Sequence, residues 1–348
     1  MALARKPALT PARAPAVSVC IANYNGRETL AAAIRSVLAQ VAPFEVELLV
    51  HDDASPDHDL SGLQAEFPQV DLLLGEPNAG YCISNNRMAA IARGEYILLL
   101  NNDAVLHADA LASLHARARA LRGGAILGLP QFDMASGALI DRGSLLDPFL
   151  NPLPNLDPAR REVVMVMGAC LWIPRPLWQE LGGFPEWFET LAEDLYLCGR
   201  ARLAGHPVEV LASSGFDHWV GRSLGGGKVV EQGLRTTRRR RRLSERNKTY
   251  AMLVLYPWPA LWRVPLHFLL LIAEGLLLSL VKRDLSLWRE IYWNTFACAW
   301  RERARILAAR GEAQAARRAG TRAFFSTHTF LPHKLRLLLR HGVPTLDA

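Results

Sequence analysis

Residues 17–26 read VSVCIANYNG, and this stretch decides the fold because an apolar strand runs directly into a polar turn. Residues 17–22 (VSVCIA) are typical of a buried β-strand, and Asn-Tyr-Asn-Gly at 23–26 is typical of a turn. Residues 29–40 follow with apolar side chains at helical spacing. A buried strand, a polar turn and a helix in this order predict the first unit of an α/β domain.

The same alternation continues outward along the chain. Residues 46–50 (VELLV) predict a second strand that ends at His51-Asp52-Asp53, and residues 70–74 predict a third. A helix is expected over 81–92, and a fourth strand over 96–100 (YILLL) ends at Asn101-Asn102-Asp103. This βαβαβαβ order predicts a mostly parallel sheet with helices on both faces. Such sheets bind ligands beyond the carboxyl ends of their strands, where these polar clusters lie.

The second half of the chain is less regular. We expect irregular structure over 131–161, a strand over 163–173 interrupted at Gly168, and a short helix over 176–181. A helix over 192–204 opens with Glu193-Asp194, and a last strand over 208–211 precedes His218. Beyond Gly221 come a glycine-rich loop, five consecutive arginines at 238–242, an apolar stretch over 250–281 and a basic helical tail.

Charge divides the chain of 348 residues into two parts. Residues 1–220 contain 16 basic and 25 acidic side chains, whereas residues 221–348 contain 24 and 8. A uniformly basic nucleic-acid-binding protein is excluded, because the first part would repel a phosphate backbone. The five cysteines form no CxxC pair, which favours reduced thiols in a cytosolic protein. Residues 1–16 have no apolar core of 7–15 residues, so we interpret them as a flexible leader and not as a signal peptide.

Three polar clusters are candidates for chemistry, each with a simpler explanation. Asp52-Asp53 could hydrogen-bond a base or a ribose, or could cap a helix or form an Asx turn. Asp103, with His218 as a second ligand, could hold a divalent cation against phosphates, or could belong to a turn. Glu193-Asp194 could supply a general base, or could only favour the dipole of the helix that follows.

Together these segments resemble family 2 inverting glycosyltransferases of the GT-A fold, in particular the rhamnosyltransferase branch. The resemblance covers residues 17–225, and its order and spacing are specific. It rests on VSVCIANYNG, VHDDAS, NAGYCISNNRMAA, GEYILLLNND, GGFPEWFETLAEDLYLCGRARLAG and HWVGRS. It implies a nucleoside-diphosphate sugar donor, with dTDP-rhamnose favoured and a UDP-sugar as the alternative. It also implies a polysaccharide or lipid-linked saccharide acceptor.

The resemblance assigns roles to individual residues. Asp194 matches the catalytic base, supported by Glu193, and Asp103 matches the last position of the DxD-like motif, the ligand of Mg²⁺ or Mn²⁺. His218 matches the histidine that completes the metal site. The implied substrate-binding residues are Asn23, Tyr24, Asp52, Asp53, Asn78, Gly80, Asn85, Asn86, Asn102 and Trp187.

The sequence departs from the family pattern at two places. Asn101 stands where the DxD motif usually begins with aspartate, although Asp103 is kept. Pro185, Glu189 and Leu191 replace residues that shape the acceptor side, so the acceptor is left open. Two other functions are alternatives: a sugar-phosphate nucleotidyltransferase, whose Gly- and Arg/Lys-rich loop is missing after the first strand, and a non-catalytic membrane scaffold that keeps the fold.

The C-terminal region suggests contact with a membrane. Residues 264–281 are 18 in number, about 27 Å as a helix, which is slightly short for a bilayer core, and they contain His267 and Glu274. A single span, a membrane-surface arrangement, and a soluble cap or dimer interface are the alternatives. Flanking arginines and tryptophans favour the surface arrangement on an anionic membrane. We therefore expect a leader (1–16), a GT-A domain (17–224), a basic linker (225–249) and a helical membrane-associating region (250–348), peripheral on the inner face of the cell membrane.

Overall fold

The computed structural model describes residues 2–56, 60, 62–121, 124–219, 226–230, 233–330, 332–341 and 345–347. The chain divides into two compact units. The first unit comprises Met1–Ser144, Pro154–Ala201 and His206–Trp219. The second comprises Leu145–Leu153, Arg202–Gly205 and Val220–Ala348. The predicted boundary at residue 224 lies outside the described residues, as do residues 220–223 of the HWVGRS motif.

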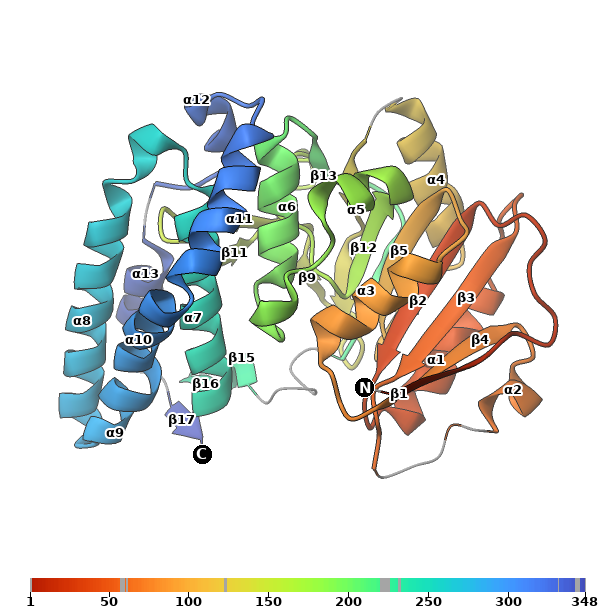
Figure 1. Ribbon diagram of the computed structural model, residues 1–348, viewed down its shortest axis with the longest axis horizontal. Helices are drawn as coiled ribbons and strands as arrows, with labels where there is room; N and C mark the ends of the chain where they lie inside the picture. Colours follow the sequence, from red (N-terminus) through yellow and green to blue (C-terminus); the bar gives the residue numbers. More distant parts are fainter. Residues whose placement is uncertain are drawn as a thin grey trace. The chain divides into compact units, whose positions relative to one another are not determined.

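An eight-stranded sheet forms the centre of the first unit, in the order β1-β4-β3-β2-β5-β12-β7-β13 (Figure 1). Its strands are β1 (Ala2–Lys6), β2 (Val17–Asn23), β3 (Val46–Asp52), β4 (Val70–Glu76), β5 (Tyr96–Asn101), β7 (Ile126–Gly128), β12 (Cys170–Pro174) and β13 (Val208–Val210). Strands β4, β3, β2 and β5 are parallel, and β12 is antiparallel to β5. Asn23 lies opposite Asp52, and Ala22 opposite Asn101, so the polar strand ends meet at one edge.

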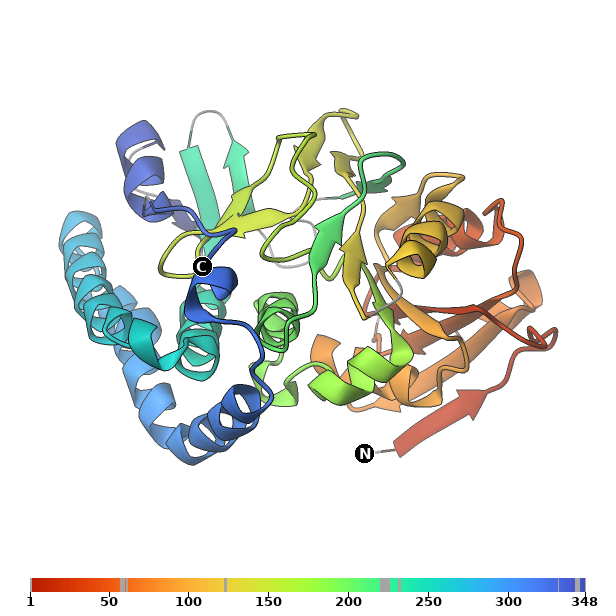
Figure 2. The ribbon, with the colours of Figure 1, turned by 90° about the horizontal axis from the view of Figure 1, so that it is seen from above.

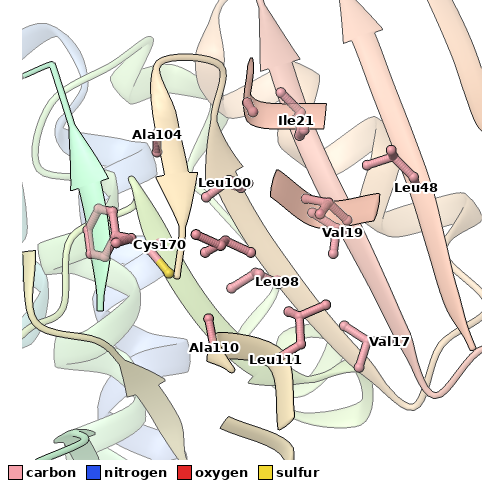
Figure 3. Close-up of a cluster of buried hydrophobic side chains, with 14 of the residues drawn as sticks. Val17, Val19, Ile21, Leu48, Leu98, Leu100, Ala104, Ala110, Leu111 and Cys170 are labelled. Carbon is pink, nitrogen blue, oxygen red and sulfur yellow. The ribbon is translucent and has the colours of Figure 1, made fainter. Parts of the chain in front are cut away.

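Helices cover both faces of this sheet, as predicted (Figures 1 and 2). The helices of the unit are α1 (Arg27–Leu38), α2 (Leu63–Glu66), α3 (Tyr81–Ile91), α4 (Ala110–Ala120), α5 (Arg175–Leu181), the 3₁₀-helix η1 (Glu186–Phe188) and α6 (Glu193–Leu203), which reaches into the second unit. Alternate residues of β2 and β5, among them Val19, Ile21 and Leu98, pack with α1 and α4 in one buried cluster (Figure 3). Strand alternation leaves the intervening side chains, such as Cys20, for the face that α3 covers.

A second, four-stranded sheet lies in the same unit, in the order β6-β14-β8-β9. Its strands are β6 (Ala104–Leu106), β8 (Gln131–Asp133), β9 (Leu139–Asp141) and β14 (Phe216–His218). His218 pairs with Ala104 across β14 and β6, and Phe216 pairs with Gln131 across β14 and β8. Three segments that are far apart in the sequence thus meet beside Asp103.

Two segments of the chain are more ordered than predicted from the sequence. The leader, predicted to be flexible, contains β1, which pairs antiparallel with β4. Arg5 of this strand forms a 2.6 Å ion pair with Asp71, which helps to fix it on the sheet edge. The region 131–161, expected to be irregular, contains β8 and β9 and the paired strands β10 (Ser144–Leu146) and β11 (Pro152–Pro154).

The second unit is mainly helical. Its helices are α7 (Arg238–Leu255), the 3₁₀-helix η2 (Trp258–Ala260), α8 (Arg263–Lys282), α9 (Leu285–Leu287), the π-helix η3 (Trp288–Trp293), α10 (Asn294–Arg301), α11 (Arg303–Ala315), α12 (Thr321–Phe324) and α13 (His333–His341). Strands β15 (Gly226–Val230), β16 (Gly233–Thr237) and β17 (Thr345–Asp347) form a small sheet. The described part of the predicted linker 225–249 thus consists largely of β15, β16 and α7. The Thr237 hydroxyl caps the start of α7 by accepting the backbone N–H of Arg240 at 3.2 Å.

Candidate active site

The first cluster at the sheet edge is centred on Asp52, the last residue of β3. Its Oδ1 accepts hydrogen bonds from Asn23 Nδ2 at 2.8 Å and from Ser55 Oγ at 2.6 Å. Asn23 Oδ1 in turn accepts from Asn102 Nδ2 at 2.7 Å. Because these donors are neutral, they orient the Asp52 carboxylate while leaving its charge in place. The predicted residues Asn23, Asp52 and Asn102 therefore form one hydrogen-bonded group.

Asp53 organises the loop that enters α3. Its two carboxylate oxygens accept the backbone N–H groups of Ala79, at 2.8 Å, and Gly80, at 2.7 Å. Gly80 has a φ of +93°, a conformation that favours glycine, and it precedes the first residue of α3. The Asp53 carboxylate thus positions the predicted donor loop by binding backbone N–H groups of that loop.

Asp103 and His218 are brought together by the smaller sheet. His218 Nε2 lies 3.0 Å from Asp103 Oδ1, and both side chains are buried. Gln131 Nε2 lies 3.0 Å from the other ring nitrogen, Nδ1, and so fixes the orientation of the ring. Asn101 Nδ2 approaches His218 Nε2 at 3.4 Å. The pair that the sequence singled out as metal ligands is therefore adjacent in the fold.

Asp194 is connected to this pair through Tyr81. The backbone N–H of Gly168 donates to Asp194 Oδ2 at 3.1 Å. The Tyr81 hydroxyl lies 3.0 Å from the carbonyl oxygen of Gly168 and 3.2 Å from Asn101 Oδ1. Burial, together with the charges of Glu193 and Asp194, raises the pKa of Tyr81 well above its ordinary value, so its hydroxyl stays protonated. Asp194 also lies in the first turn of α6, where the helix dipole favours a negative charge.

The other predicted residues differ in exposure and in the contacts that they make. Tyr24 is 51% exposed, and Asn78 is exposed as well. Asn85 donates to the carbonyl of Tyr81 within α3, whereas Asn86 binds both backbone groups of Phe184 and so holds the turn before η1. Trp187 is half-buried on η1. The structure assigns Asn85 and Asn86 positions that stabilise the fold, and their role in substrate binding stays a prediction.

Sequence reasoning missed four contributors: Ser55, Tyr81, Gln131 and the backbone of Gly168. Ser55 follows Asp52 by three residues, the spacing at which a capping side chain accepts a backbone N–H, and the Ser55 N–H donates to Asp52 Oδ2 at 3.3 Å, so a local signal existed. Gln131 gave none, because its position beside His218 depends on the pairing of β8 with β14. Within the described part of the chain, no group of three His, Cys, Asp or Glu side chains is placed to hold a metal ion. Asp103 and His218 would therefore supply two ligands, with the remaining positions left to substrate or water.

Comparison with known proteins relates part of the chain to glycosyltransferases. Residues 18–175 match the family model described as Glycosyl transferase family 2. Asp52, Asp53 and Asp103 lie inside the matched residues, whereas Asp194 and His218 lie beyond them.

Three known proteins are similar to parts of the chain. Succinoglycan biosynthesis protein ExoO of Rhizobium meliloti is 33% identical over 125 residues, 36% of this chain and 35% of that protein. The putative teichuronic acid biosynthesis glycosyltransferase TuaG of Bacillus subtilis is 31% identical over 93 residues, 26% of this chain and 36% of that protein. The chain thus spans about a third of the length of these relatives. The crystal structure of GalNAc-T7 with UDP, GalNAc and Mn²⁺ aligns with 68% of this chain and 48% of that chain, at a TM-score of 0.56 and 15% identity, which shows the GT-A fold.

Proposed function

We propose that the chain transfers a sugar from a nucleoside-diphosphate donor to a hydroxyl of a saccharide acceptor, with inversion at the anomeric carbon. The observation that carries this proposal is the adjacency of Asp103 and His218 at the sheet edge. Asp52 lies at the same edge, and the contacts through Asn101, Tyr81 and Gly168 connect the pair to Asp194. This reaction needs a carboxylate that binds the nucleotide base, a pair of ligands near the diphosphate and a carboxylate that accepts a proton. Asp52, the Asp103–His218 pair and Asp194 are the candidates for these three roles.

The nucleotide and sugar are assigned by resemblance. Asp52 would accept a hydrogen bond from an N–H of the pyrimidine base, and the Asp53 loop would approach the ribose and phosphates. The rhamnosyltransferase resemblance favours dTDP-rhamnose, while the UDP and GalNAc bound to GalNAc-T7 support a UDP-sugar as the second candidate. The names of ExoO and TuaG support a polysaccharide or lipid-linked saccharide acceptor.

The Asp103–His218 pair fits a divalent cation. Ligands about 2.1 Å from an octahedral cation have neighbouring ligand atoms about 3.0 Å apart, the separation of Asp103 Oδ1 and His218 Nε2. The buried Oε1 of Gln131 has no hydrogen-bond partner. A half-turn of this amide would let Oε1 accept from His218 Nδ1–H, which leaves the Nε2 lone pair for a metal. Bound Mg²⁺ or Mn²⁺ would neutralise negative charge on the diphosphate.

Asp194 is proposed to act as the general base, with Glu193 beside it in α6. It would take the proton of the acceptor hydroxyl as the oxygen attacks the anomeric carbon. The bond from that carbon to the phosphate oxygen breaks, and the nucleoside diphosphate leaves with the electron pair. The Gly168 N–H fixes Asp194 Oδ2, and the protonated Tyr81 hydroxyl fixes the Gly168 carbonyl. These contacts hold the base at a constant place relative to Asn101.

The second unit is proposed to attach the enzyme to the inner face of the cell membrane, near its acceptor. Residues 221–348 contain 24 basic and 8 acidic side chains, which supports an anionic surface as the partner of this region.

Donor hydrolysis in the absence of acceptor tests the proposed reaction. A panel of nucleotide sugars, including dTDP-rhamnose and several UDP-sugars, would be incubated with the full chain with and without Mn²⁺. We expect Mn²⁺-dependent release of one nucleoside diphosphate, and its identity names the donor. Release of inorganic diphosphate from a nucleoside triphosphate and a sugar phosphate would identify a nucleotidyltransferase. No turnover of any donor, with or without saccharide acceptors, would support the non-catalytic scaffold.

A further inference from the structure

The helix α8 separates its polar and apolar side chains by face. Trp258–Lys282 is long and apolar enough to cross a membrane by length and composition, although 28% of its most apolar window is buried. The inward face consists of the buried His267, Leu271, Gly275, Leu278 and Ser279 together with the half-buried Glu274. The outward, exposed face consists of Leu266, Leu269, Leu270, Ile272, Leu276, Leu277, Leu280 and Val281. His267 and Glu274, the two polar residues noted in the apolar segment 264–281, thus lie on the inward face.

The polar groups of the inward face are bound to other helices of the second unit. Glu274 forms ion pairs with Arg241 of α7 and, at 2.7 Å, with Lys334 of α13. Burial opposes ionisation of Glu274, but the charges of Lys334 and Arg241 hold its pKa below the ordinary value. His267 Nε2 lies 2.9 Å from Thr249 Oγ1 of α7, and burial lowers the pKa of His267 to about 4, so the ring is neutral at pH 7.

Close packing also fixes α8 against η3. A Cβ added to Gly275 would lie 2.6 Å from ring atoms of both Trp288 and Tyr292, so this glycine permits the close approach. Leu271 and Leu278 join Leu287, Ile291 and Tyr292 in one buried cluster. A helix held along one whole side by ion pairs, a hydrogen bond and ring contacts cannot cross a bilayer alone, because spanning would expose those groups to lipid.

The outward face is too apolar to be an ordinary soluble surface. Leu277 is 54% exposed and Leu280 75%, and Trp258, just before the helix, is 77% exposed. Contiguous exposed apolar patches of this kind mark protein or membrane contacts. Tryptophan at the end of such a helix is typical of a membrane interface.

The basic residues near the outward face favour a membrane contact over a protein contact. Glu245 and Glu274 form ion pairs within the second unit, so their negative charges are compensated there. Lys282 and Arg283, by contrast, are exposed at the end of α8. Arg263 stacks on Trp262 at the other end, 4.9 Å from the ring centre. A second copy of the chain would bring a like-charged surface to this face. An anionic lipid surface complements it, at about 1 kcal/mol for each basic residue near the headgroups.

We propose that the outward face of α8 lies in the plane of an anionic membrane surface, with its leucines in the acyl boundary, and that α8 does not span the bilayer. This inference rests on the proposed membrane partner and specifies the surface and orientation. It is independent of the donor chemistry.

Vesicle flotation of the full chain tests the surface. With vesicles of 30% phosphatidylglycerol in phosphatidylcholine, we expect binding at low salt that a Leu277→Glu/Leu280→Glu variant weakens at least tenfold. A Leu38→Glu/Val41→Glu variant changes two exposed apolar residues of the first unit instead, and should bind within twofold of wild type. Absence of vesicle binding, or equal binding of the two variants, would overturn the proposal. A solution dimer that only the α8 variant dissociates would identify a second copy as the occupant. Lipid-free donor hydrolysis by each variant reports separately on the catalytic proposal.

Depth measurements test the orientation. In a Cys298→Ser background, single cysteines at Leu266, Ile272 and Leu280 would carry a fluorophore, quenched by lipids with nitroxides at two depths; the four remaining cysteines are buried. An in-plane helix predicts equal depth at all three positions. A deep label at Ile272 with shallow labels at both ends would show a spanning helix and contradict the proposal.

Discussion

The carboxylates Asp52 and Asp53 at the sheet edge of the first unit differ in their partners from the carboxylates Glu245 and Glu274 of the second unit. In the first unit, Asp52 accepts from an amide and a hydroxyl, and Asp53 from two backbone N–H groups. In the second unit, Glu245 pairs with Lys248 at 3.3 Å and with Lys334 at 2.7 Å, and Glu274 pairs with Arg241 and Lys334. Neutral donors hold the first set, and cations hold the second.

This difference separates carboxylates that orient a ligand from carboxylates that stabilise a fold. A neutral donor directs a carboxylate without cancelling its charge, so the charge can act on a base, a cation or a proton. An ion pair cancels the charge, and removing one member leaves the other buried and uncompensated. We therefore expect charge removal to reduce function at the sheet edge of the first unit and to reduce stability at Glu245 and Glu274 of the second.

The largest expected effect is on catalysis. Asp194→Asn keeps the size of the side chain but removes the proton acceptor, so the transfer rate should fall about 10²–10⁴-fold. Binding of the donor nucleotide, measured by titration calorimetry, should stay within about twofold. Asp157→Asn, at an exposed position of the same unit, is the matched control and should retain full rate. A parallel loss of donor affinity and rate in the Asp194 variant would contradict the base assignment.

The counterpart in the second unit is Glu245→Gln. It leaves Lys248 and Lys334 without their shared carboxylate, so the free energy of unfolding should fall by about 3–5 kcal/mol. Chemical denaturation followed by circular dichroism measures this loss. Glu312→Gln, on the exposed surface of α11, should change stability very little. Equal stability of the two variants would remove the distinction between the two units.

A smaller effect is expected at Gln131, which touches the ring of His218 and lies one contact away from Asp103. Gln131→Leu removes the group that orients the ring, and Mn²⁺ affinity should fall about 10–100-fold. Electron paramagnetic resonance of free Mn²⁺ measures the affinity directly. The exposed Gln69→Leu serves as control. Unchanged Mn²⁺ affinity in a folded Gln131 variant would show that the amide only packs there.

The smallest effect is expected at Ser55. Ser55→Ala removes the 2.6 Å hydrogen bond to Asp52 but leaves Asn23 in place. A net loss of about 1 kcal/mol corresponds to roughly fivefold weaker nucleotide binding. Titration of the nucleoside diphosphate, with melting temperature as the stability check, measures it. A loss of stability without a change in affinity would place Asp52 among the structural carboxylates.

The parallel sheet and its ligand edge could be predicted from local patterns. Apolar runs that stop at Asp52 and at Asn101 specify both a strand and its polar carboxyl end, and parallel register then brings those ends together. The helix that opens at Glu193 was equally visible in the sequence. The glycosyltransferase domain followed from the order of these segments, and the family match over residues 18–175 agrees with it.

Features set by tertiary contacts could not be predicted. Gln131 reaches His218 only because β8 pairs with β14 across 87 residues. The order of β1 depends on an ion pair with Asp71, and the inward direction of Glu274 depends on Arg241 and Lys334. The sequence shows only that Glu274 interrupts an apolar segment, whereas the fold gives it ion pairs with Arg241 and Lys334.

The proposed reaction requires Asp103 and a divalent cation to act together on a nucleoside diphosphate. Titration calorimetry of UDP and dTDP into the full chain, with and without Mn²⁺, tests it most directly. We predict that Mn²⁺ strengthens binding of one nucleotide at least tenfold in the wild type and not in Asp103→Ala. Equal affinities with and without Mn²⁺, or the same enhancement in the variant, would contradict the account.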